Sequence, residues 1–215
     1  MADAVNYKRE GEIAVIRVDN PPVNALSLPV RKGLAEAFAE FEQDADALAA
    51  VLICAGRTFI AGADITEFDK PIEDPWLPKV VEQMEACTKV IVAAIHGTAL
   101  GGGFETAMAC HYRCALASAK VGLPEVLLGR LAGATVTQRL PRLIGVKDAL
   151  EVMISGQPMP AELAHERGAV DEIIEGDLLE GAVAYARRLV SEKAAPRRIS
   201  EIVIDPASLP EGFFV

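Results

Sequence analysis

Two glutamates, Glu105 and Glu125, stand where a carboxylate can do proton chemistry. Glu105 follows the glycine run 101–103, and Glu125 follows Pro124. Two carboxylates in unlike environments can divide general acid and general base work, because burial and neighbouring charges push their pKa values apart. If the fold brings this pair together across a pocket, the sequence predicts an enzyme that transfers protons.

Two runs of small residues precede expected helices and offer backbone N–H groups to a ligand. Residues 61–65 read Ala-Gly-Ala-Asp-Ile, and Asp64 is placed to cap the following helix. Residues 101–103 lie at a second helix start. Two such N–H groups converging on one carbonyl oxygen would form an oxyanion hole, which stabilises an enolate. Taken singly, a glycine run also serves an ordinary tight turn, and a glutamate in a first helical turn also suits the helix dipole.

Other nucleotide, nucleophile and metal motifs are missing from the sequence. Thr106 stands where a Gly-x-Gly-x-x-Gly fingerprint needs its last glycine, and no Gly-Lys-Ser/Thr follows a glycine loop. No Gly-x-Ser-x-Gly is present either. The four cysteines and three histidines lack zinc-site spacing, so we expect no metal and buried, reduced thiols.

Composition bounds the class of protein. The chain has 215 residues, 51% of them apolar, which is enough for one sizeable core. Its formal net charge is −10 without a long Lys/Arg run, so neither nucleic acid nor a membrane surface is an expected partner. The first residues lack the apolar core of a signal peptide, and a cytoplasmic protein is expected.

Strands alternating with helices must position these loops. Apolar runs predict strands over residues 13–18, 50–55, 90–95, 113–117 and 170–174. Helical patterns cover residues 29–43, 77–88, 104–110 and 181–193, and the chain after Gly133 is expected to be mostly helical. The fold class is therefore α/β, and the similar spacing of the strand, turn and helix units indicates a layered, spiral stacking.

Four motifs occur in order, namely 61–65, 96–105, 123–126 and 137–145. Together they resemble the enoyl-CoA hydratase/isomerase family, the crotonase superfamily, over residues 13–174. The resemblance implies a crotonase-like spiral of ββα turns that binds acyl-CoA, with no cofactor beyond the coenzyme A thioester that is its substrate. The thioester oxygen would be held by the N–H groups of Ala63 and Gly102. The residues that the resemblance assigns to coenzyme A or substrate binding are Ala25, Leu26, Ala61, Ala63, Asp64, Ile65, Gly102 and Gly133.

In hydratase members of the family both glutamate positions are occupied, as they are here. The resemblance therefore implies an enoyl-CoA hydratase that adds water across the C2–C3 double bond in fatty-acid β-oxidation or related acyl-CoA catabolism. Glu125 is expected to donate a proton at C2, and Glu105 to position and deprotonate the water. Alternatives are a Δ3,Δ2-enoyl-CoA isomerase, an acyl-CoA hydrolase, or a non-catalytic coenzyme A-binding module.

The sequence departs from the family pattern in two places. Residues 132–137 read Ala-Gly-Ala-Thr-Val-Thr, so Thr135 and Val136 stand where the family usually has glycines, and Arg130 adds a charge nearby. The family's further C-terminal helices are also missing. We expect a catalytic domain over residues 1–193 and an extended tail over 194–215, resembling the N-terminal hydratase part of a multifunctional fatty-acid oxidation enzyme. The resemblance implies a homo-oligomer, a trimer in the family, although the helices that build that assembly are absent here.

Overall fold

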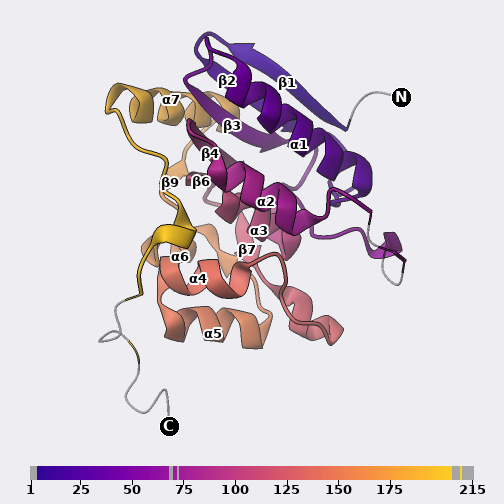
Figure 1. Cartoon of the computed structure of the whole chain (residues 1–215). Coiled ribbons are helices and arrows are strands. Elements are labelled where there is room, and N and C mark those ends of the chain that lie inside the picture. Colours follow the sequence, from indigo (N-terminus) through magenta and orange to yellow (C-terminus); the bar gives the residue numbers. More distant parts are fainter. Residues whose placement is uncertain (1–3, 68–69, 72, 205–208, 210–215) are drawn as a thin grey trace.

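The computed structural model describes residues 4–67, 70–71, 73–204 and 209 (Figure 1). Its strands are β1 (Val5–Glu10), β2 (Ile13–Val18), β3 (Ala49–Cys54), β4 (Val90–Ile95), β5 (Thr98–Leu100), β6 (Tyr112–Leu116), β7 (Lys120–Gly122), β8 (Met159–Pro160) and β9 (Glu172–Ile174). Its α-helices are α1 (Leu28–Gln43), α2 (Leu77–Ala86), α3 (Gly102–Ala109), α4 (Val136–Ile144), α5 (Val146–Ser155), α6 (Ala161–Glu166) and α7 (Leu178–Ser191). The 3₁₀ turns are η1 (Ile65–Glu67), η2 (Pro124–Leu128) and η3 (Ile199–Glu201).

The larger sheet has the strand order β1-β2-β3-β4-β6-β9. β1 and β2 form an antiparallel hairpin, whereas the pairs from β2 onward are parallel. Parallel neighbours need crossover connections, and α1, α2 and α3 supply them after β2, β3 and β4. The predicted α/β class and the strand, turn, helix unit are confirmed.

Both faces of this sheet are covered, which explains why its inner strands are nearly all apolar. Ile16 and Leu52 point to one face and pack with the buried residues of α1, α2 and α3. Val15 and Val51 point to the other face and pack against α7. Figure 1 shows α1 and α2 together on one side of the strands and α7 apart from them.

A second, three-stranded sheet sits beside the first and sets the position of the two predicted loops. β5 pairs parallel with β7, and β7 pairs antiparallel with β8. Isolated bridges join Ile60 to Ala99 and Leu26 to Ala63. The chain around Ala63 is thereby fixed next to the strand that leads into α3, so the two runs of small residues meet at one edge. This layering is the spiral of ββα turns that the family resemblance implies.

The chain after Gly133 is mostly helical, as predicted. α4 and α5 form an adjacent pair with α6 close by, below the strands in the view of Figure 1. Within the described residues, no helix combines the length and the apolar character needed to cross a membrane.

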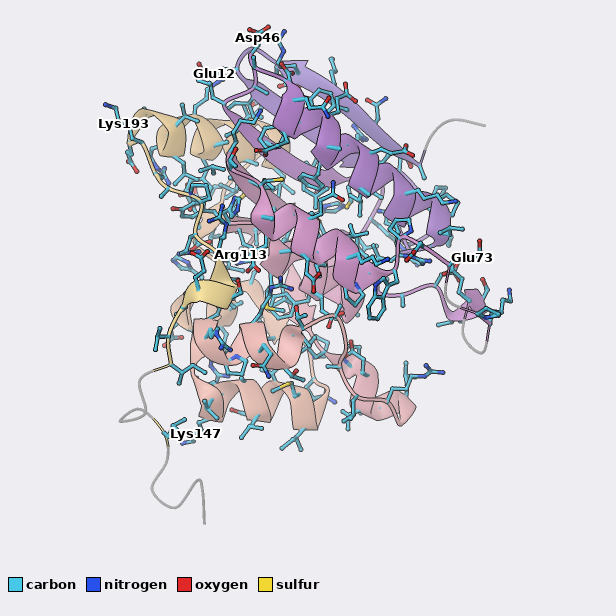
Figure 2. All side chains as sticks on the ribbon, in the orientation of Figure 1. Glu12, Asp46, Glu73, Arg113, Lys147 and Lys193 are labelled. Atoms are coloured by element: carbon cyan, nitrogen blue, oxygen red, sulfur yellow. The ribbon has the colours of Figure 1, made fainter. Side chains whose placement is uncertain are left out.

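A buried arginine anchors the segment that follows α7. Arg113 is fully buried and donates to the carbonyl of Ala169 at 2.8 Å, and Figure 2 shows it inside the body of the molecule. Its Nη2 lies 3.3 Å from Asp171, whose other oxygen lies 2.5 Å from Arg197. Residues 194–204, part of the predicted extended tail, thus contain η3 and pack on the body, with Ile199 fully buried. The domain boundary at residue 193 stays a prediction.

The four cysteines are buried free thiols, as the sequence indicated, and lie at positions 54, 87, 110 and 114. Burial raises the pKa of each thiol, that of Cys87 to about 12. They therefore stay protonated at neutral pH and are poor nucleophiles.

Candidate active site

The glycine run places Glu105 in the first turn of α3, as the sequence suggested. Gly101 is the N-cap of the helix with φ 52° and ψ −124°, a conformation that favours glycine. The missing side chain of Gly103 allows the helix to approach the preceding chain, because a Cβ there would lie 2.1 Å from the carbonyl oxygen of Ile60. Glu105 is 3% exposed, and its N–H donates to the Gly101 carbonyl at 3.0 Å.

Glu125 reaches the same glycine turn from the opposite side. It lies in η2, directly after the strand β7 that pairs with β5. A Cβ on Gly101 would lie 2.8 Å from its Oε1, so the carboxylate rests against this bare backbone. Among the buried side-chain atoms that the structure describes, Oε1 of Glu105 and Oε2 of Glu125 have no hydrogen-bond partner. The Glu125 carboxylate thus faces the start of α3, whose first turn carries Glu105, and each carboxylate has an unused acceptor atom.

Burial raises the pKa of both glutamates. Burial raises the pKa of Glu105, the charge of Glu125 raises it further, and the result is about 8. The Val136 backbone and the Arg139 charge act in the opposite direction. Burial also raises the pKa of Glu125. At neutral pH the pair therefore holds a proton more readily than two exposed carboxylates would.

The two predicted oxyanion donors lie side by side. A Cβ on Gly102 would lie 3.7 Å from the Ala63 nitrogen and 2.9 Å from both Leu26 and Leu77. Gly102 is the first residue of α3, where an N–H has no partner within the helix. In the described part of the chain, neither the Ala63 nor the Gly102 N–H donates to a backbone acceptor in a turn or loop. Both donors are therefore free to bind one carbonyl oxygen.

A cleft of about 650 Å³ opens beside these donors. Of the residues predicted to bind coenzyme A or substrate, Leu26, Ala63 and Asp64 line it. Trp76 and Leu77 add an apolar wall, which the sequence had not indicated. Asp64 also accepts from the Thr66 N–H at 2.9 Å, so it caps the short turn η1 as expected.

The other residues predicted to bind coenzyme A or substrate do not line this cleft. They are Ala25, Ala61, Ile65, Gly102 and Gly133. Gly102 lies behind the lining residues Leu26, Ala63 and Leu77. Ile65 is 70% exposed, so it remains accessible to a ligand at the rim. Asn24, next to Ala25, is buried and donates to the carbonyls of Ala55 and Thr58, so its side chain holds the loop.

Arg31 ties the walls of the cleft together and was not predicted. Its guanidinium donates to the carbonyls of Leu26 and Pro75, each at 2.8 Å, and to that of Glu73 at 3.3 Å. It also forms an ion pair with Glu67 at 2.6 Å. The second oxygen of Glu67 accepts from the Leu28 N–H at 2.7 Å. One buried cation thus fixes three segments of the cleft wall.

The altered loop before α4 has a conformation unusual for its residues. Thr135 has φ 74°, in the left-handed region where a β-branched residue is strained, and Ala134 has φ 33°. The Thr135 hydroxyl accepts a hydrogen bond from Arg139. Arg130, also in this region, lines the cleft. The loop therefore has a turn that suits glycine, but a threonine occupies the left-handed position.

Comparisons with known proteins identify the family. The model of the enoyl-CoA hydratase/isomerase family matches residues 8–211. A peroxisomal bifunctional enzyme of Danio rerio is 44% identical over 94% of this chain and 28% of its own length. A probable enoyl-CoA hydratase of Bacillus subtilis is 39% identical over 94% of this chain and 81% of its own length. The chain thus spans about a quarter of the bifunctional relatives that it matches.

Solved structures show the same fold. The crystal structure of enoyl-CoA hydratase from Mycobacterium tuberculosis superposes with a TM-score of 0.82 at 33% identity, over 88% of this chain and 76% of that one. That from Bacillus anthracis gives 0.82 at 32% identity, over 87% and 77%. The four ordered motifs, the ββα spiral and the paired glutamates beside two free N–H groups all point the same way. This chain belongs to the enoyl-CoA hydratase/isomerase family.

Proposed function

We propose that this chain is an enoyl-CoA hydratase, which converts a trans-2-enoyl-CoA into a 3-hydroxyacyl-CoA. The observation that carries the proposal is the pair of glutamates at the start of α3: Glu105 lies in its first turn, and Glu125 rests against its N-cap Gly101. Each has a buried oxygen that has no hydrogen-bond partner. A water molecule between two such carboxylates would satisfy both acceptors. Relatives named as hydratases and as β-oxidation enzymes support the same reaction.

The reaction joins the water oxygen to C3 and a proton to C2. One carboxylate takes a proton from the water while the other carboxyl group gives its proton to C2, so the pair holds one proton before and after. Negative charge develops on the thioester oxygen as C3 is attacked. The N–H groups of Ala63 and Gly102 stabilise that charge, because they are oriented before the substrate binds.

The roles of the two glutamates follow from where the proton starts. We expected Glu125 to donate at C2 and Glu105 to act on the water. That assignment needs the proton of the pair on Glu125 when water and substrate are bound. The reverse assignment needs it on Glu105. An exchange measurement described in the Discussion separates the two.

The cleft lined by Leu26, Ala63 and Asp64 accommodates the coenzyme A part of the substrate in this proposal. Its wall is apolar at Trp76 and Leu77, and no cofactor is required for the hydration. A cytoplasmic location and a homo-oligomer stay predictions.

The test follows crotonyl-CoA hydration by the absorbance of the enoyl thioester, with coenzyme A binding measured in parallel. We expect Glu105→Gln and Glu125→Gln each to lower kcat by roughly 10²-fold to 10⁴-fold while coenzyme A still binds. Retained hydration in either variant would contradict the proposal. If the unmutated chain binds coenzyme A without hydrating, and instead converts a 3-enoyl-CoA to the 2-enoyl isomer, the isomerase alternative replaces it.

A further inference from the structure

Arg139 is a buried cation in α4, and although it lies in the 137–145 motif, no role has been assigned to it above. It is 3% exposed, and it pairs with Glu85 of α2, which is 7% exposed. The contact is two-pronged, with Nη2 to Oε2 at 2.8 Å and Nε to Oε1 at 3.4 Å. Its remaining Nη1 is directed to the loop before α4, where it donates to the Thr135 hydroxyl and to the Ala134 carbonyl at 3.4 Å.

The turn that Arg139 holds lies beside the helix that carries Glu105, because α4 packs against α3. Val136, the residue after Thr135, is fully buried, and its backbone acts on Glu105 to lower its pKa. The position of this backbone depends on the left-handed conformation of Thr135, which glycine would adopt without strain. The hydrogen bonds of the Arg139 side chain therefore stabilise a left-handed turn that a glycine would adopt without them.

The segment after α7 completes the support of Arg139. The Ser200 N–H donates to Oε1 of Glu85 at 3.1 Å. Arg198 and His111 both contact the Glu85 carbonyl oxygen, at 3.1 and 3.2 Å. Glu85 is thus fixed from three directions, and it fixes Arg139 in turn.

We propose that Arg139 is a positioning residue for the reaction: it holds the 134–135 turn so that Val136 lies against Glu105, and Glu85 with Ser200 keeps Arg139 in place. This deepens the proposed hydratase function and rests on it. Arg139 itself acts through the turn and through its charge, and Glu105 makes the contact with the water.

Two charged groups act on Glu105, and they have opposite effects. Glu125 of η2 raises its pKa, whereas Arg139 of α4 lowers it. Glu85 partly offsets the Arg139 charge because it is paired with it. Removing the guanidinium should therefore raise the pKa of Glu105 above that of the unmutated protein.

The test compares Arg139→Lys, Arg139→Gln and the double variant E85Q/R139Q, which leaves neither charge buried alone. Each of these three variants is prepared in two forms, one that keeps Thr135 and one that also carries Thr135→Gly. Crotonyl-CoA kcat and KM are measured from pH 5 to pH 9, together with thermal unfolding. The Glu105 carboxyl is titrated by ¹³C NMR and assigned with Glu105→Gln. Arg142→Gln is the matched control, since Arg142 lies on the same helix and its guanidinium donates to Gln138 instead of to the 134–135 turn.

We expect E85Q/R139Q to lower kcat roughly tenfold to a hundredfold with a smaller change in KM. The Glu105 titration should move to higher pH. Arg139→Lys should keep the Glu105 pKa close to that of the unmutated protein, because lysine keeps the positive charge. It should preserve less of kcat, because lysine lacks the planar, two-pronged guanidinium. In the double variant, Thr135→Gly should recover kcat, since glycine adopts the left-handed turn without help from Arg139. It should leave the Glu105 pKa raised, since the positive charge is still missing. Arg142→Gln should change neither.

Two results would overturn the inference: a Glu105 titration unchanged in every Arg139 variant, or a kcat loss that Thr135→Gly does not relieve in a folded double variant. If the unmutated protein fails to hydrate, the proposed function fails. The NMR titration of Glu105 still decides the role of Arg139, because it needs no turnover.

Discussion

Gly101 lies so close to Glu125 that a Cβ on the glycine would fall 2.8 Å from the carboxylate Oε1. Real Cβ atoms essentially never approach so near, so the carboxylate occupies the space that any side chain at this position would need. The conformation of the N-cap of α3 and the placement of the second glutamate are therefore set by the same residue.

Gly101→Ala should abolish most of the hydration without unfolding the protein. The added methyl group displaces the Glu125 carboxylate, and a displacement of about 1 Å can cost roughly 10²-fold in rate. The measurement is kcat for crotonyl-CoA beside the thermal unfolding midpoint.

Gly145→Ala is the matched control. Gly145 is also a helix N-cap at positive φ, but a Cβ there would meet nothing within 4 Å. It should show the strain of a positive φ in its unfolding midpoint and leave kcat near that of the parent. Equal kcat losses in both variants would mean that strain, and not the collision with Glu125, is responsible.

The stability of the protein should fall as pH rises from about 4.5 to about 8. The folded state binds the Glu105 proton more tightly than the unfolded state, because burial and Glu125 raise its pKa to about 8. The proton stabilises the fold at low pH, and this contribution is lost as pH passes through the folded pKa. The full shift corresponds to a free energy on the order of 5 kcal/mol.

Urea unfolding at several pH values, for the parent and for Glu105→Gln, measures this effect. The difference between the two proteins in free energy of unfolding should change over that pH range and level off above it. Parallel curves for parent and variant would show that Glu105 titrates normally in the folded protein.

Exchange of the C2 protons of a saturated acyl-CoA should depend on only one of the two glutamates. Butyryl-CoA has no double bond to hydrate, so exchange with deuterated water reports proton transfer at C2 alone. If Glu125 acts at C2, Glu125→Gln should lose the exchange and Glu105→Gln should keep it. The reverse pattern, read by proton NMR, would reassign the acid and base.

Arg31→Met should weaken the binding of coenzyme A thioesters more than it slows the chemistry. The buried guanidinium holds the Leu26, Glu67 and Pro75 parts of the cleft wall. Each acceptor left unsatisfied costs about 1–3 kcal/mol, which releases the wall. We expect KM for crotonyl-CoA to rise about fivefold to fiftyfold with kcat within about threefold.

The N-acetylcysteamine thioester, which lacks the nucleotide, should show a smaller change in KM. Lys79→Met removes the exposed pair with Asp74 beside the same wall and should change little, since such pairs contribute about 0–1 kcal/mol. A KM effect of equal size with the truncated thioester would place the action of Arg31 at the reacting end.

The long buried elements could be predicted from the sequence, and the short ones could not. β2, β3 and β4 are apolar runs because both faces of their sheet are covered, and that signal is visible without a structure. β5 and β7 have three residues each, too few for a periodic pattern. β1 reads Val-Asn-Tyr-Lys-Arg-Glu, and because most of these residues are polar, no apolar run indicates that it is an edge strand.

The candidate site divides in the same way. The glutamates and the glycine runs were visible because their local sequence carries their function. Arg139 and Glu85 are 54 residues apart, and the pair exists only because α4 packs near α2. Arg31 likewise finds its acceptors up to 44 residues away. Charged residues on helices usually face solvent, so no local pattern distinguished these two arginines from the others.

The glycine run at the start of α3 restricts substitution for three unrelated reasons. Gly101 leaves room for a carboxylate, Gly102 faces the cleft wall beside Ala63, and Gly103 lets the backbone touch Ile60. The placement of the Glu125 carboxylate, the recognition of the ligand and the packing of the chain each depend on one of these three adjacent glycines. No single compensating change elsewhere could restore all three, so tolerance to mutation in this stretch should be the lowest of any loop described in the protein.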